Sequence, residues 1–551
     1  MTASKTVSRK NSLTSSLSSK VKGWQNRQRF ERLAKQVRRH AHPGPDAAPV
    51  IVFNASARLG GLSQNAAFSL LAAWSLRLAG YPVVHFVCQS GMSHCVLGTD
   101  RQDHRTPPPC EVCIAQSNRI YSGAQVEPFS YREDPGLAAR LSGMDVEQLA
   151  GFEYPSPVPG SEPSIPLGSM ALPSVRWALR RHTLPDDEPT RYLLRAYMLS
   201  AYNIARELAA LLERLQPQVV VVFNGLMYPE AAARWMCRQM GIRSVAHEVG
   251  YQRFSVFFSE GDPTAYPIDI PPDFKLSDRQ NAQIDAYLEQ RLQGRFTMAG
   301  IQFWPEMRGL DEAFLQKASG FRQIVPVFTN VIYDTSQVHA NVLFPNMFAW
   351  LDAVLESIRS HPDTIFVIRA HPDEMRPGSA KQSRESVHDW VKNNRVDELP
   401  NVVFIDSQEY ISSYELILRA KFVMVYNSSI GLEATLMDKA VLCAGKARYT
   451  QIPTVFFPHS LAEYYQMAEK MLATDELALP AEFKTNARRF LYYQLYRASL
   501  PFDAFLEAGR RMGFVELQDF SWEALLPQNT PALSVIIDGI LHGKPFLMPE
   551  N

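Results

Sequence analysis

Residues Val423–Gly445 read VMVYNSSIGLEATLMDKAVLCAG, and this stretch decides the fold. The apolar run Val423–Val425 predicts a buried parallel strand. Asn427, Ser428 and Ser429 follow it at the start of a predicted helix, where hydroxyl and amide groups can cap free backbone N–H groups. A helix start of this kind favours anions such as phosphate. The order of strand, polar turn, helix and strand therefore predicts an α/β fold with an anion site at a strand end.

A second predicted strand, Thr364–Ala370 (TIFVIRA), ends in the polar turn HPDE at residues 371–374. Because the carboxyl ends of parallel strands lie at one edge of a sheet, we expect this turn beside the Asn-Ser-Ser turn. His371 can donate to a phosphate oxygen, and Arg369 adds positive charge; the alternative for His371 is a cap on the turn. The two strand ends together predict a nucleotide-sugar site.

Three further residues are assigned to the donor. Glu433, one turn into the predicted helix, can accept hydrogen bonds from ribose hydroxyls. Lys446 and Arg448 follow the next predicted strand, Val441–Cys443, and can close over a phosphate or a sugar carboxylate. The alternatives are a partner of the helix dipole for Glu433 and a solvated basic loop for the other two.

The first half of the chain also alternates strands and helices. Its predicted strands are Pro49–Asn54, Val83–Cys88, Val219–Phe223 and Ile242–Ala246. Glu248 follows the last of them, where a carboxylate facing the cleft can act as the base that sugar transfer to a hydroxyl requires. Asn224, at the neighbouring strand end, is assigned to acceptor hydroxyls. A structural carboxylate is the alternative for Glu248.

This alternation predicts the fold class α/β, with two Rossmann-like parallel-sheet domains facing a cleft and a C-terminal helical segment. We assign residues 1–45 to a basic tail, 46–315 to an acceptor domain, 316–480 to a nucleotide-sugar domain and 481–551 to C-terminal helices. The acceptor domain carries a Cys- and Pro-rich insertion at 88–190, which we expect over the cleft.

The composition of the 551 residues is that of a globular protein, with 46% hydrophobic residues and a formal net charge of zero. This balance gives no indication of nucleic-acid binding. We find no apolar run of transmembrane length and no secretory signal, so we expect a cytoplasmic protein.

The first 42 residues are strongly basic, with eleven Lys and Arg against one acid, Glu31. The Ser-rich start predicts disorder, and residues 21–40 can form a basic helix. Three interpretations stay open: a solvated tail, electrostatic docking on the anionic inner face of the cell membrane, or a transit peptide.

Four cysteines fall close together in the sequence, with six, fourteen and two residues between them: Cys88, Cys95, Cys110 and Cys113. This spacing can complete a tetrahedral structural zinc site, with His94 and His104 as alternative ligands. Free thiols and an iron–sulfur or redox site are the other interpretations. Catalysis itself is expected to need no cofactor, because P-loop, zinc-protease and Asp-x-Asp motifs are absent.

The motifs RAHPDE (369–374), YNSSIGLEATLMDKAV (426–441) and GKARY (445–449) resemble those of bacterial capsule polysaccharide biosynthesis proteins. That family includes glycosyltransferases of the two-Rossmann GT-B fold that resemble capsule Kdo transferases. HEVG (247–250) and FNG (223–225) support the resemblance more loosely, and it covers roughly residues 50–500.

The resemblance implies roles for individual residues. His371, Ser428 and Ser429 would bind the nucleotide phosphate, and Glu248 would be the base. In CMP-sugar transferases of this architecture the base belongs to a pair of acids, and here Val249 stands in place of the second.

We therefore predict a glycosyltransferase that moves a sugar from a CMP- or UDP-linked donor to a surface polysaccharide or glycolipid. The alternatives are a UDP-sugar 2-epimerase, an enzyme that transfers a polyol phosphate from a CDP donor, and a non-catalytic scaffold for polysaccharide assembly.

Overall fold

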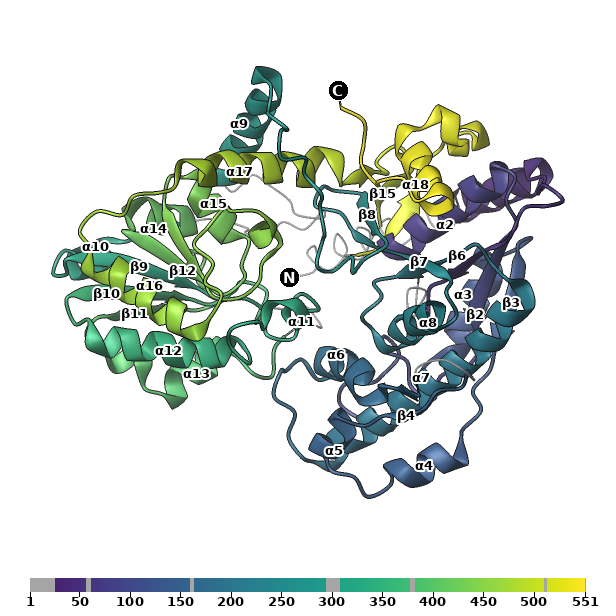
Figure 1. The fold of residues 1–551 in the computed structure, drawn as a ribbon, viewed down its shortest axis with the longest axis horizontal. Helices are drawn as coiled ribbons and strands as arrows, with labels where there is room; N and C mark the ends of the chain where they lie inside the picture. The colour runs from purple at the N-terminus through teal and green to yellow at the C-terminus, as the bar shows by residue number, and fades with distance from the viewer. Residues whose placement is uncertain are drawn as a thin grey trace, which may run out of the picture.

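The computed structural model describes residues 25–55, 61–158, 163–293, 308–376, 382–509 and 513–550. Two lobes each contain a β-sheet, and they lie side by side (Figure 1). The predicted fold class is confirmed.

The sheet of the first lobe has the order β14-β8-β7-β6-β1-β2-β3. Its strands are β1 (Val50–Phe53), β2 (Val83–Cys88), β3 (Gln125–Phe129), β6 (Val219–Phe223), β7 (Arg243–Val249), β8 (Ser255–Ser259) and β14 (Leu500–Pro501). The first five of these pair in parallel, and β8 pairs antiparallel with both of its neighbours, β7 and β14. The strand order reverses between β1 and β6.

Helices cover both faces of this sheet, because strands such as β1 are apolar on both sides. Ile51 and Phe53 pack toward the helices α6–α8, while Val50 and Val52 pack toward α2, α18 and the helical residues 25–40. The helices of this lobe are α2 (Gln64–Leu78), α3 (Cys110–Ile120), α4 (Pro135–Leu141), α5 (Val146–Ala150), α6 (Leu167–Leu179), α7 (Glu188–Leu215) and α8 (Tyr228–Gln239); β4 (Tyr154–Pro155) and β5 (Ser164–Ile165) form a small hairpin.

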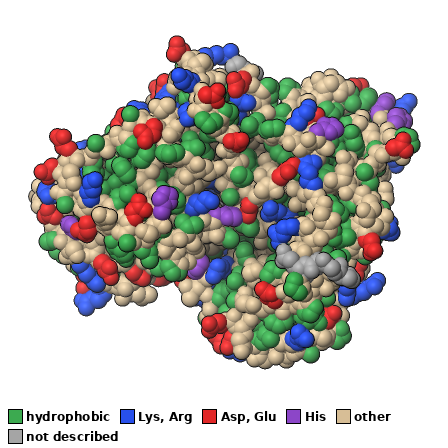
Figure 2. Space-filling view, viewed as in Figure 1, with side chains coloured by type: hydrophobic (Ala, Val, Ile, Leu, Met, Phe, Trp, Pro, Cys, Tyr) green, Lys and Arg blue, Asp and Glu red, His purple; other side chains and the backbone are tan. Residues whose placement is uncertain are grey.

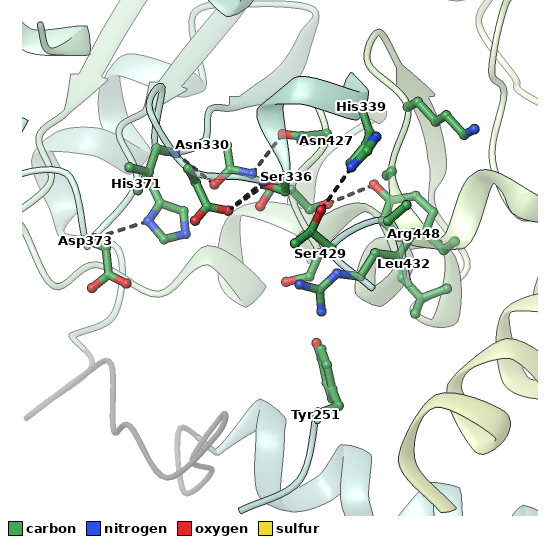
Figure 3. A pocket seen from close by; sticks show the side chains of 18 of the residues that line it. Tyr251, Asn330, Ser336, His339, His371, Asp373, Asn427, Ser429, Leu432 and Arg448 are labelled. Atoms are coloured by element: carbon green, nitrogen blue, oxygen red, sulfur yellow. Dashed lines mark hydrogen bonds between the residues drawn. The ribbon is translucent and has the colours of Figure 1, made fainter. Parts of the chain in front are cut away.

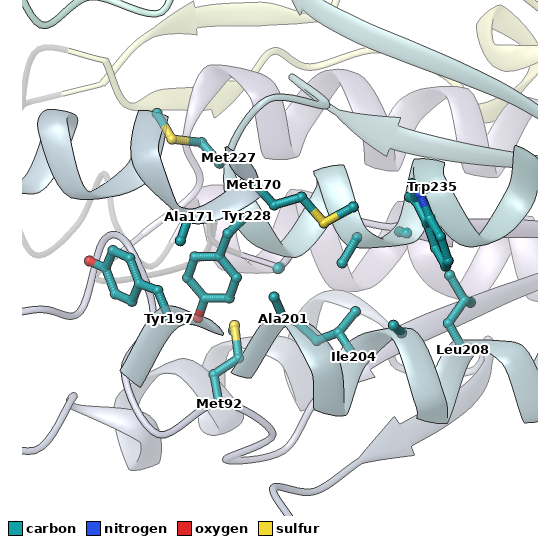
Figure 4. Close-up of a cluster of buried hydrophobic side chains, with 14 of the residues drawn as sticks. Met92, Met170, Ala171, Tyr197, Ala201, Ile204, Leu208, Met227, Tyr228 and Trp235 are labelled. Atoms are coloured by element: carbon teal, nitrogen blue, oxygen red, sulfur yellow. The ribbon is translucent and has the colours of Figure 1, made fainter. Parts of the chain in front are cut away.

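The largest core of the first lobe lies where α6, α7 and α8 meet (Figure 4). The rings of Tyr197 and Tyr228 stack there with centroids 4.7 Å apart. Met170, Ala201 and Ile204 fill the space beside them. The small side chain of Ala201 permits close helix packing, which holds the end of α6 firmly at the cleft.

The second lobe has a fully parallel sheet of order β11-β10-β9-β12-β13. Its strands are β9 (Gln323–Phe328), β10 (Thr364–Arg369), β11 (Val402–Ile405), β12 (Phe422–Val425) and β13 (Ala440–Cys443). Its helices are α9 (Asp278–Leu292), α10 (Glu312–Ala318), α11 (Gln337–Ala340), α12 (Met347–Ser360), α13 (Val387–Asn393), α14 (Ser413–Arg419), α15 (Ile430–Leu436), α16 (Leu461–Ala473) and α17 (Ala481–Tyr492), with the 3-10 turns η1 (Val396–Glu398) and η2 (Arg448–Gln451). The strand order reverses between β9 and β12.

The C-terminal segment is helical only in part. After α17 and the π-turn η3 (Tyr493–Arg497) the chain crosses back to the first lobe (Figure 1). There β14 pairs with β8, and β15 (Leu506–Ala508) pairs with β16 (Val515–Leu517). The turns η4 (Trp522–Leu525) and η5 (Pro527–Asn529) lead to α18 (Pro531–His542), which covers the first sheet. The assignment of 481–551 to helices alone is therefore incomplete, because these strands are too short to show a period in the sequence.

The insertion assigned to 88–190 needs correction, and the helix expected within the basic tail is present over residues 25–40. Within the insertion predicted at 88–190, β3 is a strand of the first sheet; its sequence, QVEPF, contains a proline, which is tolerated at a sheet edge. The basic tail is helical over residues 25–40 and is docked: Leu33 and Val37 are buried, and Arg29 pairs with Glu507 at 3.0 Å. Residues 1–24 lie outside the described part of the chain.

None of the described helices combines the length and apolar composition that a span across a bilayer needs.

Glu374 is a buried carboxyl group that bonds to the start of α13 in the second lobe. Its side chain is 0% exposed, and one carboxyl oxygen accepts the N–H of Val387 at the start of α13, at 2.8 Å. Burial raises the pKa of Glu374 from 4.5 to about 8, so the folded protein holds this carboxyl protonated at neutral pH.

We expect Glu374 to make stability depend on pH. The folded state binds a proton that the unfolded state releases between about pH 4.5 and 8, so its stabilising effect is complete below that window and is lost as pH rises through it. Urea unfolding of Glu374→Gln should match the wild type at pH 4 and exceed it by about 3–5 kcal/mol at pH 8.5. Parallel pH profiles for the two proteins would contradict this account.

Candidate functional site

A cavity of about 280 Å³ lies between the lobes, at the carboxyl ends of β9, β10, β12 and β13 (Figure 3). Figure 2 shows Lys, Arg and His side chains along the hollow between the two lobes. The second lobe lines the cavity with Asn330, Tyr333, Asp334, His339, His371, Asp373, Asn427, Ser428, Ser429, Lys446 and Arg448, and the first lobe adds Trp177, Arg180, Tyr251 and Thr264. Six of the predicted donor-site residues are thus brought together here.

The cavity lies at the point where the strand order of the second sheet reverses. Asn330 follows β9, and its amide donates to the Oδ1 atom of Asn427, after β12, at 2.8 Å. Gln337 of α11 donates to the same oxygen at 3.2 Å. These bonds fix the two diverging loops, and a crevice at such a reversal is where parallel sheets bind ligands.

Ser429 is placed differently from a capping residue. It occupies the position before α15 with helical backbone angles, and its side chain makes no cap hydrogen bond in the described structure. The expectation that it caps the helix is wrong, and its hydroxyl lines the cavity instead (Figure 3). Gly431 allows this turn to approach η2, because a Cβ atom there would lie only 2.3 Å from the hydroxyl oxygen of Tyr449. That hydroxyl donates to the carbonyl of Ser428 at 2.8 Å.

His371 enters the cavity in its neutral form. Burial lowers the pKa of its ring, although Asp373 and Asp334 act in the opposite direction. The backbone N–H of Asp373 donates to Nδ1 at 3.1 Å. Because Nδ1 accepts that bond, the neutral ring carries its proton on Nε2, which suits a hydrogen-bond donor.

Lys446 and Arg448 follow β13, as expected, and both line the cavity. The guanidinium carbon of Arg448 lies 3.5 Å from the ring centre of Tyr266, a residue of the first lobe. His339 makes a second contact between the lobes, since its Nε2 lies 2.9 Å from the hydroxyl of Thr264 and 3.1 Å from Asp262. The cavity is therefore closed by contacts across the cleft.

Arg369 does not reach the cavity. It is 2% exposed, and its Nη1 donates to the carbonyls of Asp406 and Glu409 at 3.1 and 2.6 Å, beyond β11. Burial lowers the pKa of Arg369 to about 10. Strand alternation turns this side chain away from the cavity, so its assignment to the donor is not supported by its position.

Glu433 is also absent from the residues that line the cavity. Its carboxylate is 6% exposed, pairs with Arg291 of α9 at 2.5 Å and accepts from the hydroxyl of Tyr414 at 2.6 Å. These partners occupy both carboxylate oxygens. The geometry thus gives Glu433 a structural role in place of the predicted contact with ribose.

Glu248 lies at the end of β7, half-buried beside the cavity and not in its lining. It accepts hydrogen bonds from Asn224 at 2.6 Å, from the N–H of Val249 at 2.8 Å and from Asn65 at 3.3 Å. Burial raises the pKa of Glu248 despite these bonds, and the negative charge of Asp334 acts in the same direction. Asn224 is itself buried and orients Glu248, so its position does not support the predicted contact with an acceptor.

In the described structure the four clustered cysteines form no disulfide. Cys88 and Cys95 each accept a backbone N–H, from Gly91 and Gly98, at 3.2 Å. Burial raises the pKa of Cys95 to about 12, and the neighbouring thiols Cys88, Cys113 and Cys110 contribute in the same sense, so the four lie in one region. Among the described residues no three His, Cys, Asp or Glu side chains form a group that would hold a metal. Structural zinc stays a prediction.

Several cavity residues were not identified from the sequence. Trp177 and Arg180 come from α6 and its C-cap, within the insertion that the sequence places over the cleft. Asp334 and His339 lie on the loop and short helix after β9. In the sequence these residues are marked only by their position after a predicted strand or within the insertion. That position does not distinguish them from neighbouring polar residues.

Residues 286–471 match the family described as capsule polysaccharide biosynthesis protein. The predicted resemblance is confirmed over this part of the chain, which includes the six predicted donor-site residues of the cavity. The comparison with curated proteins gives no match.

Among solved structures, the chain is similar to two structures of KpsC from Thermosulfurimonas dismutans. The β-Kdo 2,4-transferase is 11% identical over 55% of this chain and 84% of that chain, with a TM-score of 0.33. The β-Kdo 2,7-transferase is 14% identical over 58% and 87%, with a TM-score of 0.32. UDP-GlcNAc 2-epimerase from Neisseria meningitidis is 10% identical over 80% and 98%, with a TM-score of 0.24. These TM-scores are too low to support a conclusion about function. The fold is assigned from the two sheets described above.

The buried ion pair gives a stability prediction. Glu433→Ala leaves the charge of Arg291 buried without its carboxylate, so we expect a loss of about 3–5 kcal/mol in the free energy of unfolding. Arg291→Ala should cost a similar amount, and the double variant should cost much less than the sum. Additive losses in urea unfolding would mean that the two side chains do not depend on each other.

Proposed function

We propose that this chain is a glycosyltransferase that moves a sugar from a nucleotide-sugar donor to a capsule-type polysaccharide or glycolipid acceptor. The observation that carries the proposal is the convergence of Ser428, Ser429, His371 and Lys446 on one cavity at the strand reversal. Their part of the chain is the part that matches the capsule family. The donor nucleotide in this proposal is CMP or UDP.

The donor half of the site would stabilise the leaving nucleotide. As the bond between the anomeric carbon and the phosphate oxygen breaks, negative charge grows on the phosphate. Nε2–H of His371, the hydroxyl groups of Ser428 and Ser429, and the ammonium group of Lys446 offer donors and positive charge around the cavity. Donors fixed in advance stabilise such charge strongly. The proposed mechanism therefore needs no metal ion.

The acceptor half would supply the base. The acceptor hydroxyl oxygen bonds to the anomeric carbon, and its proton passes to the carboxylate of Glu248. A carboxyl whose pKa is raised by burial holds a proton more readily than an exposed one, which suits this role. Asn224 and Asn65 fix its orientation. Contacts between the lobes, such as Arg448 with Tyr266, hold the two halves together and exclude water.

The helical residues 25–40 would bring the enzyme to the inner face of the cell membrane, with the protein otherwise cytoplasmic. Arg27, Lys35, Arg38 and Arg39 are exposed on this helix, whose apolar side is already docked. Burial lowers the pKa of Arg77 nearby, and the charge of Arg38 adds to the effect. The contact would be electrostatic, because a cluster of cations is attracted to anionic lipid headgroups within a Debye length.

Replacing the base should abolish transfer without affecting donor binding. For Glu248→Gln we expect the rate of sugar transfer to fall about 100-fold or more, and the Kd for the nucleotide to stay within about threefold. Transfer is measured with radiolabelled nucleotide-sugar and a capsule oligosaccharide, and binding by calorimetry. Asp334→Asn is the matched control, because it removes the charge of a different carboxylate, one that lines the cavity.

The outcomes separate the candidate functions. Loss of transfer in Asp334→Asn with activity retained in Glu248→Gln would show that Asp334 is the base. Release of a free sugar or an epimer without acceptor would indicate the 2-epimerase class. Nucleotide binding with no turnover in any assay would indicate a scaffold.

The membrane contact has its own test. Full-length protein should co-sediment with vesicles containing phosphatidylglycerol and not with pure phosphatidylcholine vesicles. The binding should weaken about tenfold or more when Arg38 and Arg39 are both replaced by Ser, and further at 0.5 M salt. Vesicle binding that is unchanged by salt and by the two substitutions would show that this helix is not the membrane contact.

A further inference from the structure

Arg180 lies at the C-cap of α6 in the first lobe and lines the cavity formed mostly by the second. Its backbone has φ 58° and ψ 39°, the left-handed region in which glycine is usual at the end of a helix. An arginine there costs backbone strain that a glycine would not. The position therefore favours a role for the side chain itself.

The guanidinium group of Arg180 is held between aromatic rings of both lobes. Its carbon lies 3.9 Å from the ring centre of Trp177 and 4.9 Å from that of Tyr333. The residue is 2% exposed, and within the described part of the chain its Nε and Nη1 atoms have no hydrogen-bond partner. Buried N–H groups of a cation without acceptors are costly, and a ligand oxygen would satisfy them.

The charges around Arg180 are mostly of the same sign. Arg101 contacts the same Trp177 ring at 5.6 Å. Burial, together with the charges of Arg101 and Arg384, lowers the pKa of Arg180 to about 10, so the group is still a cation at neutral pH. Asp334 is the acid that acts in the opposite direction. An anion entering the cavity would relieve this repulsion.

We propose that Arg180 binds a phosphate oxygen of the donor nucleotide from the opposite side of the cleft to Ser428 and Ser429. The inference rests on the proposed function, since it assigns the ligand of the same cavity. A guanidinium group offers two parallel N–H donors that fit two phosphate oxygens. The first lobe would then contribute directly to the charge that stabilises the leaving nucleotide.

This placement links phosphate binding to closure of the lobes. The carbonyl of Arg180 accepts the N–H of Arg384 at 2.8 Å. Glu385 accepts the backbone N–H groups of His182 and Thr183 at 2.7 and 2.9 Å. The guanidinium group therefore reaches the cavity only when residues 180–183, which follow α6, are bound to Arg384 and Glu385 of the second lobe.

The test uses calorimetry on the full chain with CMP, CDP, UDP and GDP and with the matching nucleosides. For the nucleotide that the wild type binds, Arg180→Gln should raise the Kd about 10- to 100-fold, with the Kd of the nucleoside changed less than twofold. Arg180→Lys should give an intermediate value, because one ammonium replaces a two-pronged donor. Arg181→Gln is the control, since its neighbouring side chain does not line the cavity.

A second variant separates contact from closure. Glu385→Gln weakens the contact between the lobes and leaves the guanidinium in place, so its effect on the nucleotide Kd should be smaller than that of Arg180→Gln. An equal effect would mean that Arg180 acts through lobe packing and would overturn the inference. So would an unchanged Kd in Arg180→Gln, or an equal loss for nucleosides.

The two proposals fail in distinguishable ways. If the wild type binds a nucleotide, loses it in Ser429→Ala and keeps it in Arg180→Gln, the donor site stands and the role of Arg180 is wrong. If Arg180→Gln loses the nucleotide but no sugar is transferred under any condition, the phosphate contact stands and the transferase activity is wrong. If the wild type binds none of the four nucleotides, both proposals are wrong.

Discussion

The reversal of strand order between β9 and β12 is the constraint on which the rest of this structure depends. At that point neighbouring loops leave the sheet in opposite directions, so a crevice opens between them. The hydrogen bond from Asn330 to Asn427 holds its two sides at a fixed separation. His371, Asn427 and Lys446 each follow a strand of this sheet, so the sheet positions them relative to that bond.

The first lobe closes the crevice with a small number of polar and cation–π contacts. Arg448 lies over Tyr266, His339 meets Thr264, and Glu385 accepts from Thr183. Such contacts exchange readily with water, so each adds little net stability. Lobes joined in this way can separate and close again, and a ligand that contacts both of them shifts the balance toward the closed form. The architecture is compatible with the proposed function, in which the site would admit a donor, exclude water and release a nucleotide.

Sequence analysis could identify most of this site because its signals are local. The strands that lead to His371 and Ser428 are short apolar runs that end in polar turns, and both residues line the cavity. Glu433 shows the limit. Its partner Arg291 lies 142 residues away in the chain, and no local pattern reveals that a buried cation meets it. The edge strands β3 and β14 and the return of the C-terminal segment to the first lobe were missed for a similar reason, since long-range pairing determines them.

The buried cations of the molecule differ in whether the chain itself supplies their acceptors. Arg291 and Glu433 form a buried ion pair, so this cation has its acceptor within the chain. Arg180 is equally buried, yet in the described residues two of its nitrogens face no acceptor. A folded protein keeps an unsatisfied buried cation at a cost, and the aromatic rings beside it lessen that cost only in part. Under the inference drawn above, an anion in the cavity would complete this balance, and Arg180 would then mark the place of the donor phosphate.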